Sequence, residues 1–329
     1  MIRSIYYTSD LRLLLDPDPG DWPAALQEPE GLLWVDFEGT PPEEDEPLLR
    51  QVFGFHPLAI DDALQESHVP RVDDWGDYLY IVLHAVRVER TEGLELNTRE
   101  VDFFLGPNYL VTHHDEKVEA LDRVMDLIRR DHRYPKNGPD YLLYRLADEI
   151  VASYMPVVEE LDDEIDLAED EIFARPTNAT LEQIFRLKRA VLHLRRIIGP
   201  QREALNRLAR DDFRVIDARD QVYFRDVYDH LVRLFDIGES LRELVSGTLD
   251  TYLSVVNNRM NEIMKTFTLI TTLFMPISFV VGFFGMNFFQ PGAQQLLPWT
   301  GGPVFYLTLL VLLLLPGVMW LWMRRRGWM

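Results

Sequence analysis

Gly285, Met286 and Asn287 combine groups that can recognise a hydrated metal ion. Glycine allows the backbone to turn so that its carbonyl oxygen faces outward, and asparagine supplies a neutral amide oxygen. A small divalent cation such as Mg²⁺ holds its water shell tightly, so a ring of such oxygens at a pore mouth could bind the ion through its waters. Because a tripeptide recurs by chance, its meaning depends on the segments around it.

The tripeptide lies within residues 266–323, a run of 58 residues that contains no Asp, Glu, Lys, Arg or His. Two apolar segments, residues 266–284 and 303–323, flank a middle part (residues 285–302) that is rich in Gly, Pro and Gln. As helices they are about 28–32 Å long, close to the thickness of a bilayer's hydrocarbon core. The sequence therefore predicts a transmembrane hairpin with the tripeptide at its turn.

Basic residues on both sides of the hairpin predict its orientation. Arg259 and Lys265 precede the first span, and a basic tail (residues 324–329) with three arginines follows the second. Positive charge favours the cytosolic side, and the first 30 residues carry no signal pattern. We expect a multi-pass protein of the cytoplasmic (inner) membrane with both termini in the cytosol and the uncharged loop outside.

A polar stripe runs along the segment that leads into the first span. Steps of four and three residues from Asp250 meet only polar, small or methionine side chains, where a coiled coil would carry Leu or Ile. Close packing between helices is one interpretation, because small and polar residues mediate transmembrane helix contacts. The asparagines upstream of the membrane favour the other, in which several copies surround a water-lined axis. The stripe comprises Asp250, Ser254, Asn257, Asn261, Met264, Thr268, Thr271, Met275, Ser278 and Gly282.

The amino-acid composition excludes several classes of binding partner. The formal net charge is −21, a balance that repels nucleic acid and attracts cations. There is no cysteine, so a disulfide framework and Cys-ligated zinc are excluded. No G-x-x-x-x-G-K-[ST] pattern occurs, so we expect no nucleotide partner and no ATP-driven pumping. His113 and His114 are adjacent on a predicted strand and therefore point to opposite faces, which argues against a metal site made by their spacing.

Residues 1–135 predict an α/β domain of the cytosol. Runs rich in Val, Ile, Tyr and Phe alternate with helical segments, and Gly and Pro punctuate them. The predicted strands cover residues 5–8, 32–37, 78–88, 100–105 and 108–112, and the predicted helices cover residues 45–53, 58–65 and 117–130.

Long helices follow. Residues 136–216 predict a helical hairpin, with one amphipathic helix over 140–173 and a second over 180–210 in which Pro200 predicts a kink. A third helix within residues 217–284 continues into the first span as a stalk of ~100 Å, at 1.5 Å per residue. So long a helix needs partner helices to bury its apolar face.

Several motifs in this architecture resemble the CorA family of divalent-cation channels, over essentially the whole chain. The resemblance implies a homopentamer with an α/β cytosolic funnel, a long stalk and a two-helix C-terminal membrane hairpin. The motifs are Phe284 to Phe288 around the tripeptide, Phe224 to His230, Asp250 to Ser254, Asn261 to Lys265, Phe274 to Pro276, and His56 to Leu58 with Asp61 and Asp62.

The resemblance also implies roles for single residues. Gly285, Met286 and Asn287 would form the outer selectivity ring, and Asp250 a ring at the cytosolic entrance. Regulatory Mg²⁺ would bind between cytosolic domains at Asp61, Asp62, Asp148 and Asp226. The conduction path would be lined by Asn261, Met264, Phe267, Met275 and Ser278. Met264 and Phe267 would lie near a hydrophobic constriction, although the stripe itself places Thr268 rather than Phe267 on the axis.

The function implied is channel-like, potential-driven import of Mg²⁺, and of Co²⁺ and Ni²⁺, gated by cytosolic Mg²⁺. No nucleophile–base set or organic cofactor is evident, so no enzyme is predicted. Residues 289–295 contain no acid, where many relatives carry acids, and Phe284 stands where tyrosine is common. These departures leave a Zn²⁺ transporter of the same architecture as an alternative. A non-conducting, membrane-anchored metal sensor is a second alternative, although it would not require the stripe.

Overall fold

The computed structural model describes residues 1–10, 12–65, 69–90, 94–130, 137–284 and 302–327. These form two compact units, Met1–Tyr252 and Leu253–Met329. The first unit holds a β-sheet with helices on both faces and a group of long helices. The second holds the C-terminal part of a long helix and a further apolar helix.

In the described part of the chain, one sheet has the strand order β2-β1-β3-β7-β6-β5-β4. β3 and β7 are parallel, and the other neighbours are antiparallel. The strands are β1 (Ile2–Tyr7), β2 (Leu13–Leu15), β3 (Leu32–Glu38), β4 (Arg71–Asp74), β5 (Leu79–Arg90), β6 (Leu94–Leu105) and β7 (Tyr109–His114). The parallel pair at the centre requires a crossover, and the chain from β3 to β7 supplies it through α2, α3 and the β4–β6 meander.

Side chains alternate between the two faces of this sheet. On β3, Val35 and Phe37 pack into the buried core beneath α2 (Pro42–Gln51) and α3 (Pro57–Leu64). We call this side the α2–α3 face; α1 (Trp22–Ala25), preceded by the 3-10 turn η1 (Pro19–Asp21), adds Trp22 to the same core. The opposite side, the α4–α5 face, is covered by α4 (Glu119–Arg130) and α5 (Gly138–Ala152).

Helices α5 and α6 (Tyr154–Ala174) meet at Ser153, where the sequence predicted a single helix over residues 140–173. That prediction was wrong, and Pro156 gives the reason. Proline has no amide hydrogen, so it cannot donate to Ala152 as a continuous helix would require. The Ser153 hydroxyl instead donates to the Ile150 carbonyl, 2.6 Å away, and closes α5.

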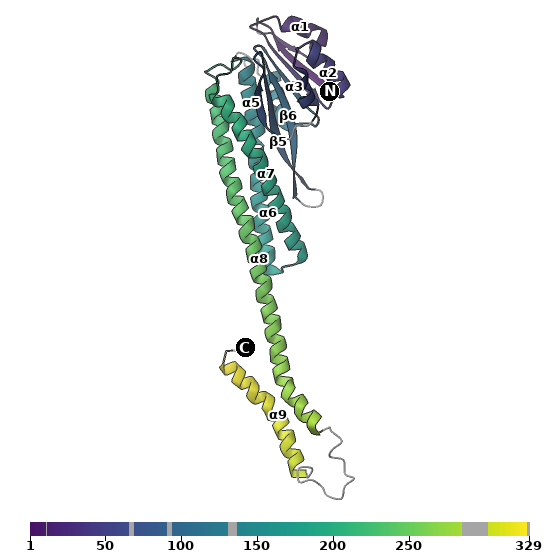
Figure 1. The fold of residues 1–329 in the computed structure, drawn as a ribbon, viewed down its shortest axis with the longest axis vertical. Coiled ribbons are helices and arrows are strands. Elements are labelled where there is room, and N and C mark those ends of the chain that lie inside the picture. Colours follow the sequence, from purple (N-terminus) through teal and green to yellow (C-terminus); the bar gives the residue numbers. More distant parts are fainter. Residues whose placement is uncertain (11, 66–68, 91–93, 131–136, 285–301, 328–329) are drawn as a thin grey trace. The chain divides into compact units, whose positions relative to one another are not determined.

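The long helices of the first unit lie side by side (Figure 1). α6 and α7 (Asn178–Arg210) form an antiparallel pair, and α7 continues through Pro200. The N-terminal part of α8 (Gln221–Phe284) packs against them: the Thr248 hydroxyl donates to the Glu169 carboxylate of α6 at 2.8 Å, and Glu239 pairs with Arg195 of α7 at 3.1 Å. These contacts join α8 to the helical pair that follows the sheet.

The second unit contains the remainder of α8 and the apolar helix α9 (Gly302–Arg325). By length and hydropathy, α8 and α9 are the two helices of the described chain that could cross a membrane, with windows of mean hydropathy 1.8 and 2.0. Almost none of either window is buried within the protein: 0% for α8 and 6% for α9. Apolar helices that stay uncovered need a surrounding of lipid or partner helices.

Candidate functional site

The predicted selectivity residues Gly285, Met286 and Asn287 lie outside the described residues. Their neighbours are described: α8 ends at Phe284 and α9 begins at Gly302. The tripeptide therefore follows directly on the C-terminal end of one apolar helix, and the connection from there leads into a second.

The polar stripe lies on an exposed face of α8. Exposed positions are Asp250, Ser254, Asn257, Asn261, Met264, Thr268, Thr271, Met275, Ser278 and Gly282. In the second unit, half-buried positions recur at Leu269, Leu273, Ile277 and Val280. At 100° per residue these four lie on the side of the helix opposite to the stripe. One chain thus leaves the stripe open over its length in the second unit.

One hydroxyl group of the stripe uses its hydrogen within the helix. The Thr268 hydroxyl donates to the Met264 carbonyl at 2.8 Å, so its oxygen can still accept a hydrogen bond from an ion's water. Phe267 is also exposed, with 64% of its surface accessible, and it flanks the stripe on the side away from Thr268. Exposure therefore does not decide between Phe267 and Thr268 as the residue nearest an axis.

Two of the predicted regulatory acids, Asp148 on α5 and Asp226 on α8, lie close together. The Asp148 carboxylate is 3.2 Å from Arg145 and 4.0 Å from the Nδ1 of His230. Its burial raises the pKa of Asp148, against the influence of Arg145 and His230, and the nearby charges of Glu149 and Asp226 raise it further. The structure thus brings together acids that are 78 positions apart in the sequence, on the surface of the first unit.

The other two predicted acids, Asp61 and Asp62, belong to α3 and hence to the opposite side of the sheet (Figure 1). Asp61 is exposed, whereas Asp62 forms an ion pair with Arg71 of β4 at 2.5 Å. Among the described residues, no hydrogen bond or ion pair joins Asp61 or Asp62 to Asp148 or Asp226. Within one chain the four acids therefore form two separate pairs, and a site that uses all four needs a second copy.

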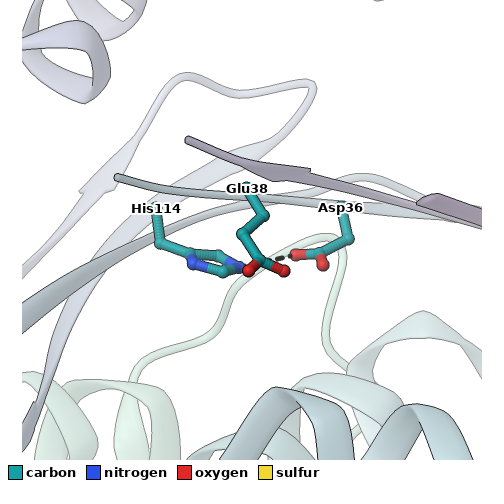
Figure 2. A group of neighbouring side chains, drawn as sticks. All are labelled: Asp36, Glu38 and His114. Atoms are coloured by element: carbon teal, nitrogen blue, oxygen red, sulfur yellow. Dashed lines mark hydrogen bonds and ion pairs between the residues drawn. The ribbon is translucent and has the colours of Figure 1, made fainter. Parts of the chain in front are cut away.

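A third group, which the sequence did not predict, lies at the C-terminal ends of the parallel strands β3 and β7. Donor atoms of Asp36, Glu38 and His114 lie within 4.8 Å of one another (Figure 2). The Nε2 of His114 is 3.2 Å from the Asp36 carboxylate, and its Nδ1 is 2.6 Å from the Glu116 carbonyl. Asp36 and Glu38, two positions apart at the end of an otherwise apolar strand, were the only hint of this group in the sequence. Their proximity to His114 could not be predicted, because it depends on the register between β3 and β7.

The charges of this third group balance without a metal ion. The Arg3 guanidinium is 2.5 Å from Asp36 and 3.2 Å from Glu38. Burial alone would raise the pKa of Asp36, but His114 and Arg3 outweigh it and lower that pKa. Burial alone would lower the pKa of His114, but Asp36 outweighs it and raises that pKa. We interpret Asp36, Glu38 and His114 as a buried ion network that fixes the ends of β3 and β7.

Comparison with known proteins gives consistent results. The family described as CorA-like Mg²⁺ transporter protein matches residues 29–325. The cobalt/magnesium transport protein CorA of Thermotoga maritima is 35% identical over 298 residues, which cover 90% of this chain and 83% of that protein. The complete structure of the CorA magnesium transporter from Methanocaldococcus jannaschii matches with a TM-score of 0.81 and 25% identity, covering 99% of this chain and 98% of that one.

A more distant structure shares the fold of the first unit. The cytoplasmic domain of ZntB from Vibrio parahaemolyticus matches with a TM-score of 0.62 and 13% identity, covering 79% of this chain and 99% of that domain. At this identity the likeness concerns the fold alone.

Proposed function

This chain belongs to the CorA-like Mg²⁺ transporter family, and from that membership we propose that it carries Mg²⁺, as well as Co²⁺ and Ni²⁺, across the cytoplasmic membrane into the cell. Two relatives that are named cobalt/magnesium transport proteins support this choice of ions. The apolar helices α8 and α9 support a location in the membrane. We propose that both termini lie in the cytosol, because basic residues flank both apolar segments.

The observation that carries the mechanism is the exposed polar stripe of α8. A helix in lipid covers its polar groups, because each unsatisfied group in the hydrocarbon region is costly. The hydroxyl and amide groups from Asn257 to Ser278 are exposed in one chain, so a closed ring of copies would turn them toward a common axis. We propose that five copies form this ring, with α8 lining a water-filled path and α9 outside it. Closed rotational symmetry is the usual form of such assemblies.

At the outer mouth, Gly285, Met286 and Asn287 would supply a ring of carbonyl and amide oxygens. Oxygen is the ligand that Mg²⁺ prefers, and Mg²⁺ gives up its waters reluctantly. A neutral ring can therefore hold the hydrated ion weakly enough for it to leave again. Along the path, Asn261, Thr268, Thr271 and Ser278 offer further oxygens to the ion's water shell.

The membrane potential would drive the ion inward. A potential of 100 mV is worth about 2.3 kcal/mol per charge, hence about 4.6 kcal/mol for a divalent ion. This drive needs neither a nucleotide nor an organic cofactor, and we propose that the protein is no enzyme.

Cytosolic Mg²⁺ would regulate the path through the acids of the first unit. Asp148 and Asp226 lie on one side of a protomer, and Asp61 and Asp62 lie across the sheet from them. In a ring, one pair could face the other pair of the next protomer. Carboxylates brought together in this way repel each other, and a bridging Mg²⁺ removes the repulsion. Bound Mg²⁺ would hold the ring symmetric and closed, and its loss would allow opening.

Transport of Zn²⁺ is the alternative that residues 289–295 leave open, because they contain no acid that would attract Mg²⁺ to the outer mouth. The deciding experiment measures uptake of Mg²⁺ and of Zn²⁺ into proteoliposomes with a K⁺ diffusion potential that is negative inside. We expect Mg²⁺ uptake that stops when the potential is removed, together with rescue of a Mg²⁺-starved strain. Uptake of Zn²⁺ alone would favour the alternative, and no uptake of any divalent ion would favour a non-conducting sensor.

A further inference from the structure

A polar pocket lies at the edge of the α2–α3 face of the sheet. It has a volume of about 220 Å³ and is lined by His84 of β5, Glu100 and Asp102 of β6, His113 of β7 and Ala63 of α3. Asp115 and Glu116, both exposed, form part of its rim. Arg99 and His114 also contribute to the lining, but Asp36 and Glu38 of the buried ion network do not.

Strand register brings these side chains together. His84 pairs with Glu100 across β5 and β6, and Asp102 pairs with His113 across β6 and β7. Residues that face each other in antiparallel strands share a face, and so do residues two apart on one strand. Four titratable side chains thus converge on one region of a sheet whose neighbouring positions are apolar.

The two histidines are deeply buried, and three of their four ring nitrogens have no hydrogen-bond partner in the described chain. His84 is 4% exposed and His113 is 3% exposed. Within the described chain, both ring nitrogens of His84 and the Nδ1 of His113 make no hydrogen bond. Buried polar groups without a partner are rare in native proteins, and each one requires an explanation. Here the unpaired nitrogens line a pocket.

His113 is oriented as a metal-binding histidine is. Its Nε2 lies 3.4 Å from the fully buried carboxylate of Asp45, which also accepts a hydrogen bond of 2.6 Å from the Thr40 hydroxyl. A carboxylate behind a histidine fixes the ring and leaves the other nitrogen free to bind an ion. That other nitrogen, Nδ1, lies 4.0 Å from the Oδ2 of Asp102.

One of the two donor pairs has a spacing that suits a single ion, and the other pair is wider. With metal–ligand bonds of about 2.0–2.2 Å, two ligands of one tetrahedral ion lie about 3.3–3.6 Å apart. The separation of His84 Nε2 from Glu100 Oε2 is 3.5 Å, and that of His113 Nδ1 from Asp102 Oδ2 is 4.0 Å. The Tyr80 hydroxyl holds the other oxygen of Asp102 at 2.5 Å.

We propose that this pocket binds one transition-metal dication per chain, of the Zn²⁺, Co²⁺ or Ni²⁺ class, through His113 and Asp102, with Glu100 and His84 completing the shell. Imidazole nitrogen suits these ions, whereas Mg²⁺ prefers oxygen ligands alone. No three of these four residues bring their donor atoms within 4.8 Å of one another in the structure, so binding of an ion would require the Glu100 and His84 side chains to move toward His113 and Asp102. This proposal rests on the first unit alone and does not depend on transport.

The buried ion network on the other face provides a contrast. There, His114 uses both ring nitrogens, and Arg3 already occupies the carboxylates of Asp36 and Glu38. On the α2–α3 face, the Nε2 of His84 and the Nδ1 of His113 lie near carboxylates, but neither they nor the Nδ1 of His84 make a hydrogen bond within the described chain. Both groups contain histidines and acids, but only in the pocket do histidine nitrogens lack hydrogen bonds. For this reason we place the metal ion in the pocket.

The test uses the full-length protein without a histidine tag, in detergent, loaded with Co²⁺ in the presence of excess Mg²⁺ that competes at oxygen-only sites. We expect one retained Co²⁺ per chain, with an X-ray absorption spectrum that shows imidazole nitrogen near 2.1 Å. His113→Gln and Asp102→Asn should weaken this binding at least tenfold, whereas His193→Gln on the exposed surface of α7 should leave it unchanged.

Results of two kinds would overturn the proposal. The first kind concerns the unaltered protein: either Mg²⁺ displaces Co²⁺ completely, or the retained Co²⁺ shows no imidazole scattering. This readout does not depend on any variant being folded. The other is retention of the same Co²⁺ spectrum in both folded variants, His113→Gln and Asp102→Asn.

Discussion

The carboxylate of Asp148 on α5 lies 4.0 Å from the Nδ1 of His230 on α8. His230 is one helical turn beyond Asp226, whose charge also acts on Asp148. This contact places an acidic pair where α8 leaves the sheet-bearing part of the first unit. An ion bound by this pair of acids would contact α8, the helix that continues into the second unit.

Replacing Asp226 tests whether this pair belongs to the Mg²⁺ sensor. Asp226→Asn removes one carboxylate from the pair, so the Mg²⁺ concentration that half-protects the protein from proteolysis should rise about threefold or more. Asp229→Asn, on an exposed position of the same helix, is the matched control and should leave that concentration unchanged. If Mg²⁺ protected both variants from proteolysis at the same concentration, Asp226 would not be part of the Mg²⁺ sensor.

Thr248 tests the attachment of α8 to α6. Its buried hydroxyl lies 2.8 Å from the Glu169 carboxylate and 2.9 Å from the Leu244 carbonyl of its own helix, so Thr248→Val removes the donor to α6 while keeping the shape of the side chain. Loss of such a bond costs about 1 kcal/mol, or about 2–4 °C of melting temperature for a unit of this size. Thr251→Val is the control, because that hydroxyl bonds only to Gly247 of its own helix. A melting temperature unchanged by Thr248→Val would mean that the hydrogen bond contributes nothing to stability.

The buried ion network predicts a pH dependence of stability. The folded-state pKa of His114 is raised above its unfolded value of about 6.5, so its contribution is complete below about pH 6.5 and is lost as pH rises through the raised pKa. His114→Gln should therefore lower the melting temperature more at pH 6 than at pH 9. His193→Gln should show the opposite trend, because burial and Arg196 lower the pKa of His193. A loss for His114→Gln that is equal at both pH values would contradict the assignment of charge to His114.

Much of the fold follows from strong local patterns. The helical period of α7 and α8 and the two uncharged apolar segments are visible in the sequence, because each extends over several turns. The central strands β3 and β7 are equally clear as runs of apolar residues. Their parallel pairing is not, since nothing local specifies which strand becomes the neighbour.

Elements that depend on tertiary pairing were missed. β4 contains two aspartates and becomes a strand because Val72 pairs with Ile81 of β5. The polar first half of β6 extends as far as Leu94 because it pairs with the equally long β5. For the same reason the sequence did not predict the pocket at His113, whose partners Asp102 and Asp45 are distant in the chain. The acids Asp148 and Asp226 were named only through the family resemblance.

The central claim is that a ring containing Asn287 passes hydrated Mg²⁺, and Asn287→Ala tests it most directly. The measurement is potential-driven Mg²⁺ uptake into proteoliposomes, with the oligomeric state of both proteins checked by light scattering. We expect the variant to assemble as the unaltered protein does. It should show no uptake above that of empty liposomes, because the amide oxygen that holds the ion's waters is gone. Normal Mg²⁺ uptake by the assembled variant would contradict the account.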